Sequence, residues 1–454
     1  MAEVDQDEDG LDVRRVTAIL EAVTAGNAGT LAGLLGQLHA ADVADLLEQI
    51  SAQDRRALLA LGAAEIDGEV LSELDESIRE EVIAALPREA VAQAMRGLES
   101  DDVVDILEDL DQPQQSMILG ALDAVDRAAV EQALTYPEDS AGRLMQREVV
   151  VAPEHWTVGE TTDHLRGADW LPDQFYHVVL VDPRMRPTGY ATLGRILSSG
   201  REVRLRDIVE DSFRTIEAVM PDEDVAYLFN QYHLISCPVV AQGGRLVGVI
   251  TIDDAMAVLE EEAEEDMLRL AGVGDGARLS DTWFQTAKQR FPWLFVNLMT
   301  AFLASSVVGL FEGTILKIVA LAVLMPIVAS QGGNAGTQGL TVAVRALATK
   351  DLTSSNVRRV IWREIAQGVA NGVMFAVITG VLTYVWFGQP LLGVVIGAAM
   401  IINLFAAALA GLLIPLGLEK LGFDPALSSG AFVTTVTDVV GFFAFLWLAG
   451  LVLL

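Results

Sequence analysis

The hydrophobic pattern changes twice along the chain and divides it into three parts. Up to about residue 135, apolar residues recur at helical spacing, and from there to about residue 260 β-branched runs alternate with helical stretches. From Phe291 onward, long apolar runs follow one another. This order predicts a multidomain protein with an all-α N-terminal domain, an α+β middle part and an α-helical transmembrane domain.

The first part, predicted to be a helical domain over residues 11–135, contains a repeated segment. Asp42-Val-Ala-Asp-Leu-Leu-Glu48 returns as Asp102-Val-Val-Asp-Ile-Leu-Glu108, and each copy places two aspartates three residues apart on one helix face. Repetition of this kind is typical of a helical superhelix. The repeat does not decide whether the aspartates lie on a solvated face or in a binding site. Residues 1–10 are acidic and are expected to form a disordered tail.

The middle part shows the same order of elements twice, which predicts two modules at residues 136–205 and 206–258. In each module a short strand and a helix precede two further strands, and the second module ends in another helix. The expected strands cover residues 148–152, 175–181, 187–192, 215–219, 237–240 and 245–251.

The second module resembles a CBS domain from Pro238 to Asp254, with Pro-Val-Val, a Gly-Gly turn and Leu-Val-Gly-Val-Ile-Thr-Ile-Asp-Asp. CBS domains occur as tandem pairs and often bind adenine nucleotides between the two halves. The resemblance implies that Pro238, Thr251 and Asp254 bind the nucleotide. In the first module Thr192 is followed by Arg195, where the family has an aspartate. Half of the pattern is therefore absent, and the binding of ATP stays open.

The stretch directly after the second module places six acids in the seven residues from Glu260 to Asp266. On a helix, like charges four residues apart destabilise by about 0.2–0.5 kcal/mol per pair. Water and monovalent salt can compensate this repulsion, but a divalent cation shared with facing carboxylates does so better. Residues 259–290 are therefore predicted to form an acidic connecting helix that transmits changes from the soluble modules to the membrane.

Five apolar spans are expected in the membrane part, each long enough for a bilayer core of ~30 Å. They cover about 292–311, 314–337, 364–387, 390–417 and 426–451. The segment between spans two and three is rich in Lys and Arg, whereas the turn after span three is uncharged. By the positive-inside rule, the N-terminal domains then lie in the cytoplasm and the C-terminus lies outside. Pro415 is expected to break span four, as Pro326 frees a carbonyl in span two.

One carboxylate, Asp438, stands in the middle of the last span, with Thr434 and Thr435 beside it. A charge at membrane depth costs at least ~2.5–3.5 kcal/mol, and such residues are functional by default. The pattern indicates a cation site, with an aspartate capped by threonine hydroxyls as the alternative. Asn334, in span two, is also costly when it faces lipid, so we expect it to face a partner helix or a wet pathway.

Charge is distributed very unevenly along the chain. The net charge is −33, but the residues from Phe291 onward carry seven basic and six acidic side chains, so the part before them carries −34. Such an acidic part is a poor ligand for nucleic acid, whose phosphates require clustered bases. The N-terminus lacks the apolar region of a signal peptide, and the single Cys237 cannot form a disulfide within the chain. The sequence has no P-loop and no nucleophile–base set, which argues against an ATP-driven pump and against an enzyme.

The whole assembly, including Gly332-Gly-Asn-Ala-Gly-Thr-Gln338 in span two, resembles the MgtE family of bacterial magnesium channels over nearly the entire chain. The resemblance implies a homodimer in the inner membrane whose pore runs along the dimer axis. It implies that Asp438 is the aspartate of the selectivity filter. It also implies that the backbone carbonyl of Thr434, one helical turn earlier, is a ligand in the pore. Because Mg²⁺ dehydrates reluctantly and prefers octahedral oxygen surroundings, two facing carboxylates would hold a hydrated ion.

The resemblance also implies a sensor, in which Mg²⁺ joins acids of the helical domain, the CBS pair and the connecting helix and thereby closes the pore. The matching residues are Asp101, Asp105, Asp254, Glu262, Glu265 and Asp266. Ala257 stands where the family has a further acid, so at least one sensor site is altered. Two alternatives remain: the same architecture carrying Co²⁺, Mn²⁺ or Ca²⁺, and a membrane-anchored nucleotide sensor that transports nothing.

Overall fold

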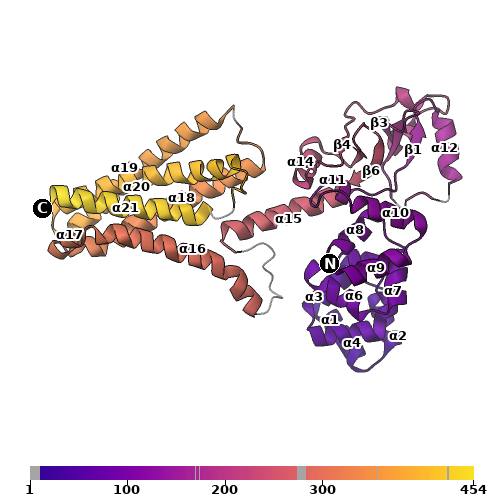
Figure 1. The fold of residues 1–454 in the computed structure, drawn as a ribbon, viewed down its shortest axis with the longest axis horizontal. Helices are drawn as coiled ribbons and strands as arrows, with labels where there is room; N and C mark the ends of the chain where they lie inside the picture. The colour runs from indigo at the N-terminus through magenta and orange to yellow at the C-terminus, as the bar shows by residue number, and fades with distance from the viewer. Residues whose placement is uncertain (1–10, 169, 173, 274–282, 354, 427–428) are drawn as a thin grey trace, which may run out of the picture. The chain divides into compact units, whose positions relative to one another are not determined.

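The structure is a computed structural model that describes residues 11–454, except 169, 173, 274–282, 354 and 427–428 (Figure 1). The chain separates into two compact units, Met1–Glu260 and Glu261–Leu454. The acidic tail predicted at residues 1–10 lies outside the described residues.

Short helices stacked around one apolar core form the N-terminal domain. They are α1 (Val13–Thr24), α2 (Ala28–Leu35), α3 (Ala40–Gln49), α4 (Ala52–Gly62), η1 (Ala63–Glu65), α5 (Gly68–Ser72), α6 (Glu76–Ala85), α7 (Arg88–Met95), α8 (Ser100–Glu108), α9 (Gln112–Ala121) and α10 (Ala124–Ala133). The two copies of the repeated acidic segment are α3 and α8, and the apolar side chains of both are buried. Side chains such as Asn27, Ser51 and Asp111 accept a backbone N–H at the start of the following helix. The all-α prediction for this domain is confirmed.

Two three-stranded sheets with the same topology follow. In each, the first strand pairs in parallel with the second, and the second pairs antiparallel with the third. The strands are β1 (Val151–Pro153), β2 (His177–Val181) and β3 (Pro187–Thr192), then β4 (Ile216–Glu217), β5 (Ser236–Val240) and β6 (Leu246–Thr251). The accompanying helices are α11 (Ala141–Leu144), α12 (Val158–Arg166), α13 (Leu193–Ser198), η2 (Leu205–Asp207) and α14 (Asp222–Tyr232). The repeated order agrees with the predicted tandem pair.

The two sheets contact each other directly. The imidazole Nδ1 of His177 in β2 is hydrogen-bonded to the hydroxyl of Ser236 in β5. The backbone N–H of Leu246 donates to the carbonyl of Met185 over 2.8 Å. Burial lowers the pKa of His177, so its ring favours the neutral form.

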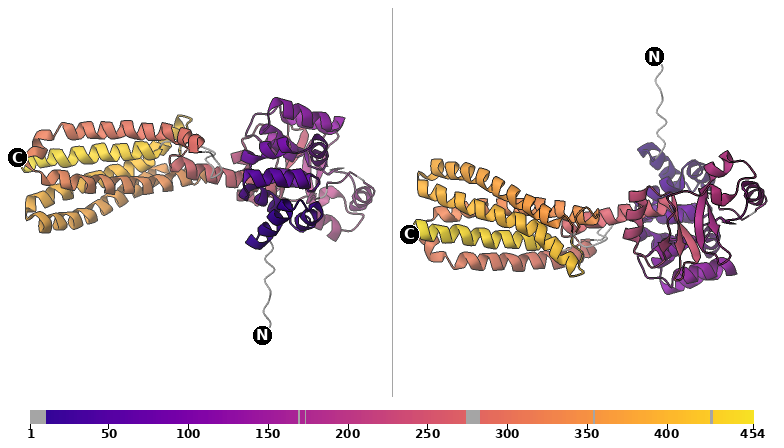
Figure 2. Two further views of the ribbon diagram at one scale, coloured as in Figure 1. Left: turned by 90° about the horizontal axis from the view of Figure 1, so that it is seen from below. Right: turned by 90° about the horizontal axis from the view of Figure 1, so that it is seen from above.

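The second unit contains the C-terminal part of α15 (Ile252–Leu270) and a bundle of long helices (Figures 1 and 2). The bundle comprises α16 (Trp283–Gly309), α17 (Glu312–Lys317), α18 (Ala320–Ala348), α19 (Val357–Phe387), α20 (Pro390–Lys420) and α21 (Ser429–Val452). Within the described residues, length and composition make four helices suitable for crossing a membrane: α16, α19, α20 and Gly430–Val452 of α21. The polar-rich α18 is not among them, so the count of five spans is not confirmed.

The prediction that Pro415 breaks its span was wrong. Helix α20 continues from Pro390 to Lys420, and α18 likewise passes through Pro326. Pro415 is buried in the bundle. Neighbouring helices and small local adjustments can satisfy the carbonyl that a proline leaves without its helical partner, so a packed membrane helix tolerates the residue.

Candidate ion-binding sites

Asp438 lies in the middle of α21, and its side chain is half-buried in the single chain. The nearby hydroxyls bond to carbonyls of their own helix. Thr434 donates to Gly430 over 3.0 Å, and Thr435 donates to Ala431 over 2.6 Å. Within the described residues the Asp438 carboxylate makes no hydrogen bond or ion pair, so threonine hydroxyls do not cap it here.

A polar face of α18 lies beside this part of α21. A Cβ built on Gly333 would stand 3.9 Å from the Thr434 side chain, which places the two helices in contact. On the same helix, Asn334, Thr337 and Gln338 are exposed in the single chain. A cavity of about 540 Å³ is lined by residues of α18, α19 and α20, among them the polar side chains of Gln338, Gln367 and Asn371. The membrane unit therefore exposes polar side chains on α18, the helix that contacts α21 at Gly333.

Asn403 in α20 is a buried polar residue that the sequence did not mark as functional. Its side chain is 0% exposed, and its Nδ2 donates to the Val328 carbonyl of α18 over 2.8 Å. A Cβ on Gly332 or on Gly441 would overlap this side chain. The asparagine thus joins α18, α20 and α21, and so positions the helix that carries Asp438.

A second group of carboxylates lies in the first unit, where α8 meets the start of α15. Asp101 is only 8% exposed, and burial together with the Asp254 and Asp102 charges raises its pKa well above the usual range. Burial also raises the pKa of Glu99 to about 7, of Asp102 to about 6 and of Asp254 to about 7. The predicted residues Asp101 and Asp254 are therefore brought together. Glu99 and Asp102 belong to the same group, although the sequence analysis assigned them no role.

Raised pKa values mean that the fold opposes the charged forms of these carboxylates. A proton or a nearby cation can relieve this cost. Within the described residues, however, no three His, Cys, Asp or Glu side chains converge as a ready-made metal site. An ion at this group would have to keep its waters or bind after a rearrangement of the side chains.

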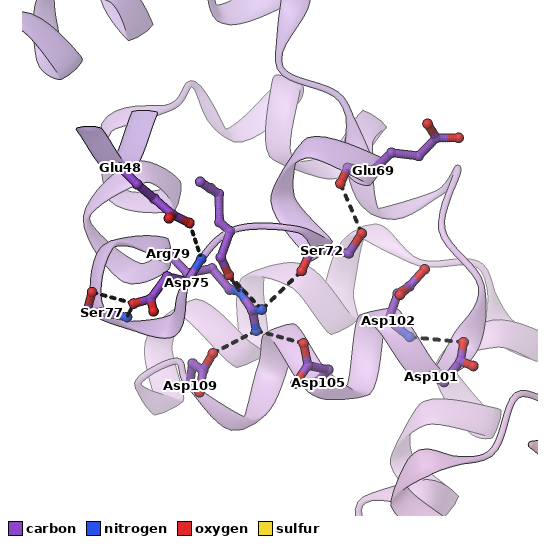
Figure 3. A network of polar contacts seen from close by, with 11 residues as sticks. Glu48, Glu69, Ser72, Asp75, Ser77, Arg79, Asp101, Asp102, Asp105 and Asp109 are labelled. Atoms are coloured by element: carbon purple, nitrogen blue, oxygen red, sulfur yellow. Dashed lines mark hydrogen bonds and ion pairs between the residues drawn. The ribbon is translucent and has the colours of Figure 1, made fainter. Parts of the chain in front are cut away.

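Asp105, one of the predicted sensor acids, lies opposite a buried arginine (Figure 3). Nη1 of Arg79 is 2.8 Å from Asp105 Oδ2 and 2.7 Å from Asp109 Oδ2. The same guanidinium donates to the backbone carbonyls of Ser72 and Leu74. Asp105 is thus paired with a fixed positive charge in this conformation.

The three predicted acids of the connecting helix, Glu262, Glu265 and Asp266, have half-buried side chains on one face of α15. One of them has a basic partner in the next turn: Oε2 of Glu265 lies 2.7 Å from Nη2 of Arg269. Ala257, where the resemblance implied a further acid, is exposed on the same helix.

Two of the three predicted nucleotide residues, Thr251 and Asp254, contact each other where β6 ends. The Thr251 hydroxyl donates to Asp254 Oδ2 over 2.6 Å, and Pro238 is buried in β5. In the first module the Thr192 hydroxyl accepts the backbone N–H of Arg195, whose side chain pairs with Glu210. The two modules therefore offer opposite charges at equivalent positions.

Comparison with known proteins decides the family. The MgtE model, described as a divalent cation transporter, matches residues 325–448; the model of the MgtE intracellular N domain matches 38–139, and the CBS domain matches 205–261. The magnesium transporter MgtE of Thermus thermophilus is 31% identical over 452 residues, covering 98% of this chain and 99% of that protein. The chain belongs to the MgtE family.

Two further relatives support membership of the MgtE family. The magnesium transporter MgtE of Bacillus subtilis is 26% identical over 416 residues, which is 92% of each protein. The crystal structure of the cytosolic domain of the Mg²⁺ channel MgtE in complex with ATP is 30% identical, with a TM-score of 0.50, over 54% of this chain and 99% of that one. The MgtE family is one of transporters and not of enzymes, as the sequence predicted. Its transporter model covers Asn334, Asn403 and Asp438.

Proposed function

We propose that this chain is a magnesium transporter that works as a Mg²⁺-selective channel for uptake and is gated by intracellular Mg²⁺. The relatives that it matches over most of its length are named magnesium transporters, which supports the choice of ion. In the proposal, two chains form a homodimer, and the Asp438 carboxylates face each other across the pore.

The half-buried carboxylate of Asp438 is the observation that carries this proposal. A charged group in a membrane helix is costly, and the nearby hydroxyls do not satisfy it. Oxygen ligands suit Mg²⁺, and a pair of carboxylates can hold a hydrated ion without removing its waters. The Thr434 carbonyl, Thr435 and Asn334 would complete an oxygen-rich pathway.

The polar face of α18 supports the homodimer. Asn334, Thr337 and Gln338 are exposed in the single chain, yet exposure to lipid would leave their polar groups without partners. A second copy of the chain and a water-filled pore between the copies would cover them. Helix α18 would then be the fifth span, and the C-terminus would lie outside an inner membrane with the N-terminal domains in the cytoplasm.

The acidic group at α8 and α15 supports the gating part of the proposal. Asp101 and Asp254 come from segments far apart in the sequence, so an ion held by both fastens the helical domain to the CBS pair. Because an ion shifts an equilibrium only by binding one state better, such shared ligands favour the closed state. The proposed sensor also includes Asp105, Glu262, Glu265 and Asp266. The proposal keeps the domain limits 11–135, 136–205, 206–258, 259–290 and 291–454.

ATP binding by the CBS pair is a second proposed property. The solved cytosolic domain of the related Mg²⁺ channel MgtE is a complex with ATP, and Thr251 with Asp254 reproduces the threonine–aspartate pattern of one half-site. Arg195 occupies the equivalent position of the other half, where its charge favours phosphate over a ribose hydroxyl. ATP would then regulate gating and would not be consumed.

Ion flux in liposomes loaded with a Mg²⁺-sensitive dye tests the channel function. Asp438→Ala should abolish Mg²⁺ flux while the protein still inserts and dimerises, and Glu419→Gln, at the end of α20, is the matched control for loss of an acid. Normal flux through Asp438→Ala would contradict the filter. Competition by Co²⁺, Mn²⁺ and Ca²⁺ decides the ion, and faster flux of one of these would favour the same architecture with another cation. No flux of any ion would favour a nucleotide sensor.

A further inference from the structure

We propose that the positive charge of Arg269 holds the C-terminal end of α15, the acidic connecting helix, against the segment preceding α21. The inference rests on the proposed function, because it names the residue that couples the acidic helix to the helix carrying Asp438. In this role Arg269 is a positioning residue, since it touches neither the pore nor the ion.

The guanidinium of Arg269 joins two carboxylates from different elements. Nη2 lies 2.7 Å from Glu265 Oε2 in the preceding turn of α15, and Nη1 lies 2.5 Å from Asp424 Oδ2 in the α20–α21 connection. All three side chains are 20–30% exposed. Partial burial and charge-assisted geometry make these contacts stronger than ordinary surface pairs.

Asp424 also contacts the backbone of the connection that precedes α21. Its second oxygen, Oδ1, accepts the backbone N–H of Ala426 over 2.7 Å. One carboxylate therefore binds the arginine and also accepts a backbone N–H at Ala426, in the connection that precedes α21. Movement of Arg269 would disturb this contact.

Apolar packing reinforces the link at the next residue. Leu270 packs against a buried cluster that includes Ala426 and Val433. A Cβ on Gly430 would stand 3.8 Å from the Leu270 carbonyl oxygen. Gly430 precedes Asp438 by about two helical turns, so the end of the acidic helix is docked at the base of the helix that holds the filter.

The chemistry of arginine separates this link from the proposed sensor sites. A guanidinium is charged at all physiological pH values and presents a rigid fork to carboxylates. A Mg²⁺ ion between Glu265 and Asp424 would have to displace it. The ion pairs of Arg269 therefore stay intact when the Mg²⁺ concentration falls. The C-terminal end of α15 then remains attached while the rest of the helix moves.

Mg²⁺ flux measured at a series of internal Mg²⁺ concentrations tests this coupling. Arg269→Gln should keep maximal flux but raise the Mg²⁺ concentration needed for closure by about fivefold or more. Asp424→Asn should act alike, and the double variant should add little. The charge swap Arg269→Glu with Asp424→Arg should restore closure in part, because one base again faces two acids while the acceptor of the Ala426 N–H is lost. Lys420→Gln, which removes an exposed base at the end of α20, should change nothing.

The proposal would be overturned if the Arg269→Gln channel closed at the same Mg²⁺ concentration as the unmodified channel. It would also be overturned if the charge-swapped channel closed no better than the single variants. Hydrogen exchange of the full-length protein gives a readout independent of flux. Asp424→Asn should speed exchange in residues 267–270, although it leaves α15 itself unaltered; unchanged exchange there would also overturn the link. If the unmodified protein carried no Mg²⁺, the proposed function would fail, while the exchange data would still decide the link.

Discussion

Nη1 of Arg79 lies 2.8 Å from Oδ2 of Asp105, so a predicted Mg²⁺ ligand is held by a positive charge of its own domain (Figure 3). Arg79 comes from α6 and is 4% exposed. It also pairs with Asp109 and donates to the Ser72 and Leu74 carbonyls, so all five N–H groups of the guanidinium have an acceptor. The helical domain thus contains an internal cation next to the proposed sensor.

Replacing Arg79 by Met should destabilise the protein by about 3–5 kcal/mol, because Asp109 would remain half-buried without its counter-charge. The loss should appear in thermal unfolding of the full-length protein. Added Mg²⁺ should recover part of it, since Asp105 becomes available to the ion. Arg56→Gln, at an exposed pair with Glu81, should cost at most about 1 kcal/mol. Equal effects of the two substitutions would refute the special position of Arg79.

The carboxylates at α8 and α15 should make stability depend on pH. Their raised folded-state values, about 7 for the pKa of Glu99 and Asp254, mean that the folded chain binds more protons than the unfolded chain between about pH 4 and pH 7. The free energy of unfolding should therefore fall as pH rises across this interval. Mg²⁺ at pH 7.5 should restore it by replacing the protons.

Hydrogen exchange of α8 in the full-length protein, at pH 5.5 and 7.5 after correction for intrinsic rates, measures this effect. Asp101→Asn should flatten both the pH response and the Mg²⁺ response, because it removes the most deeply buried carboxylate of the group. Asp211→Asn, at an exposed acid, serves as the control. A pH response that survives Asp101→Asn at full size would count against the group.

Gly441 should not tolerate a side chain. A Cβ there would lie 2.7 Å from Asn403 Nδ2, and overpacking of this kind costs about 1–3 kcal/mol. Gly441→Ala should therefore lower the melting temperature in detergent and reduce Mg²⁺ flux, since α21 would shift. Gly417→Ala adds the same methyl group where nothing lies within 4 Å and should leave both quantities unchanged.

ATP affinity should depend on Thr251 more than on Thr192. The Thr251 hydroxyl donates a hydrogen bond to Asp254 Oδ2. These two residues form the threonine–aspartate pair that is expected of a CBS half-site. Thr251→Val should weaken ATP binding about tenfold, the effect of one hydrogen bond to a charged group. Thr192→Val should have a smaller effect, and calorimetry on the full-length protein compares the two. Absence of heat with the unmodified protein at millimolar ATP would reject the nucleotide site itself.

Local pattern was sufficient for much of the architecture. Helical spacing predicted the N-terminal helices, and β-branched runs predicted strands such as β3 at 187–192 and β6 at its actual position within one residue. The lone charge of Asp438 in an apolar run was visible without coordinates. Such features depend on residues a few positions apart, which is the range over which backbone geometry alone relates side chains. Pro415 was misjudged because packing from other helices overrides its local effect.

The sequence by itself determined the division into acidic and apolar parts, the tandem modules and the position of the membrane carboxylate. Only the tertiary structure decided which opposite charges meet: Arg79 with Asp105, and Arg269 with Asp424. These partners are 26 to 155 residues apart. No periodicity relates residues at such separations, because their proximity follows from how whole helices pack. For the same reason the buried contact of Asn403 with α18, 75 residues away, became visible only in three dimensions.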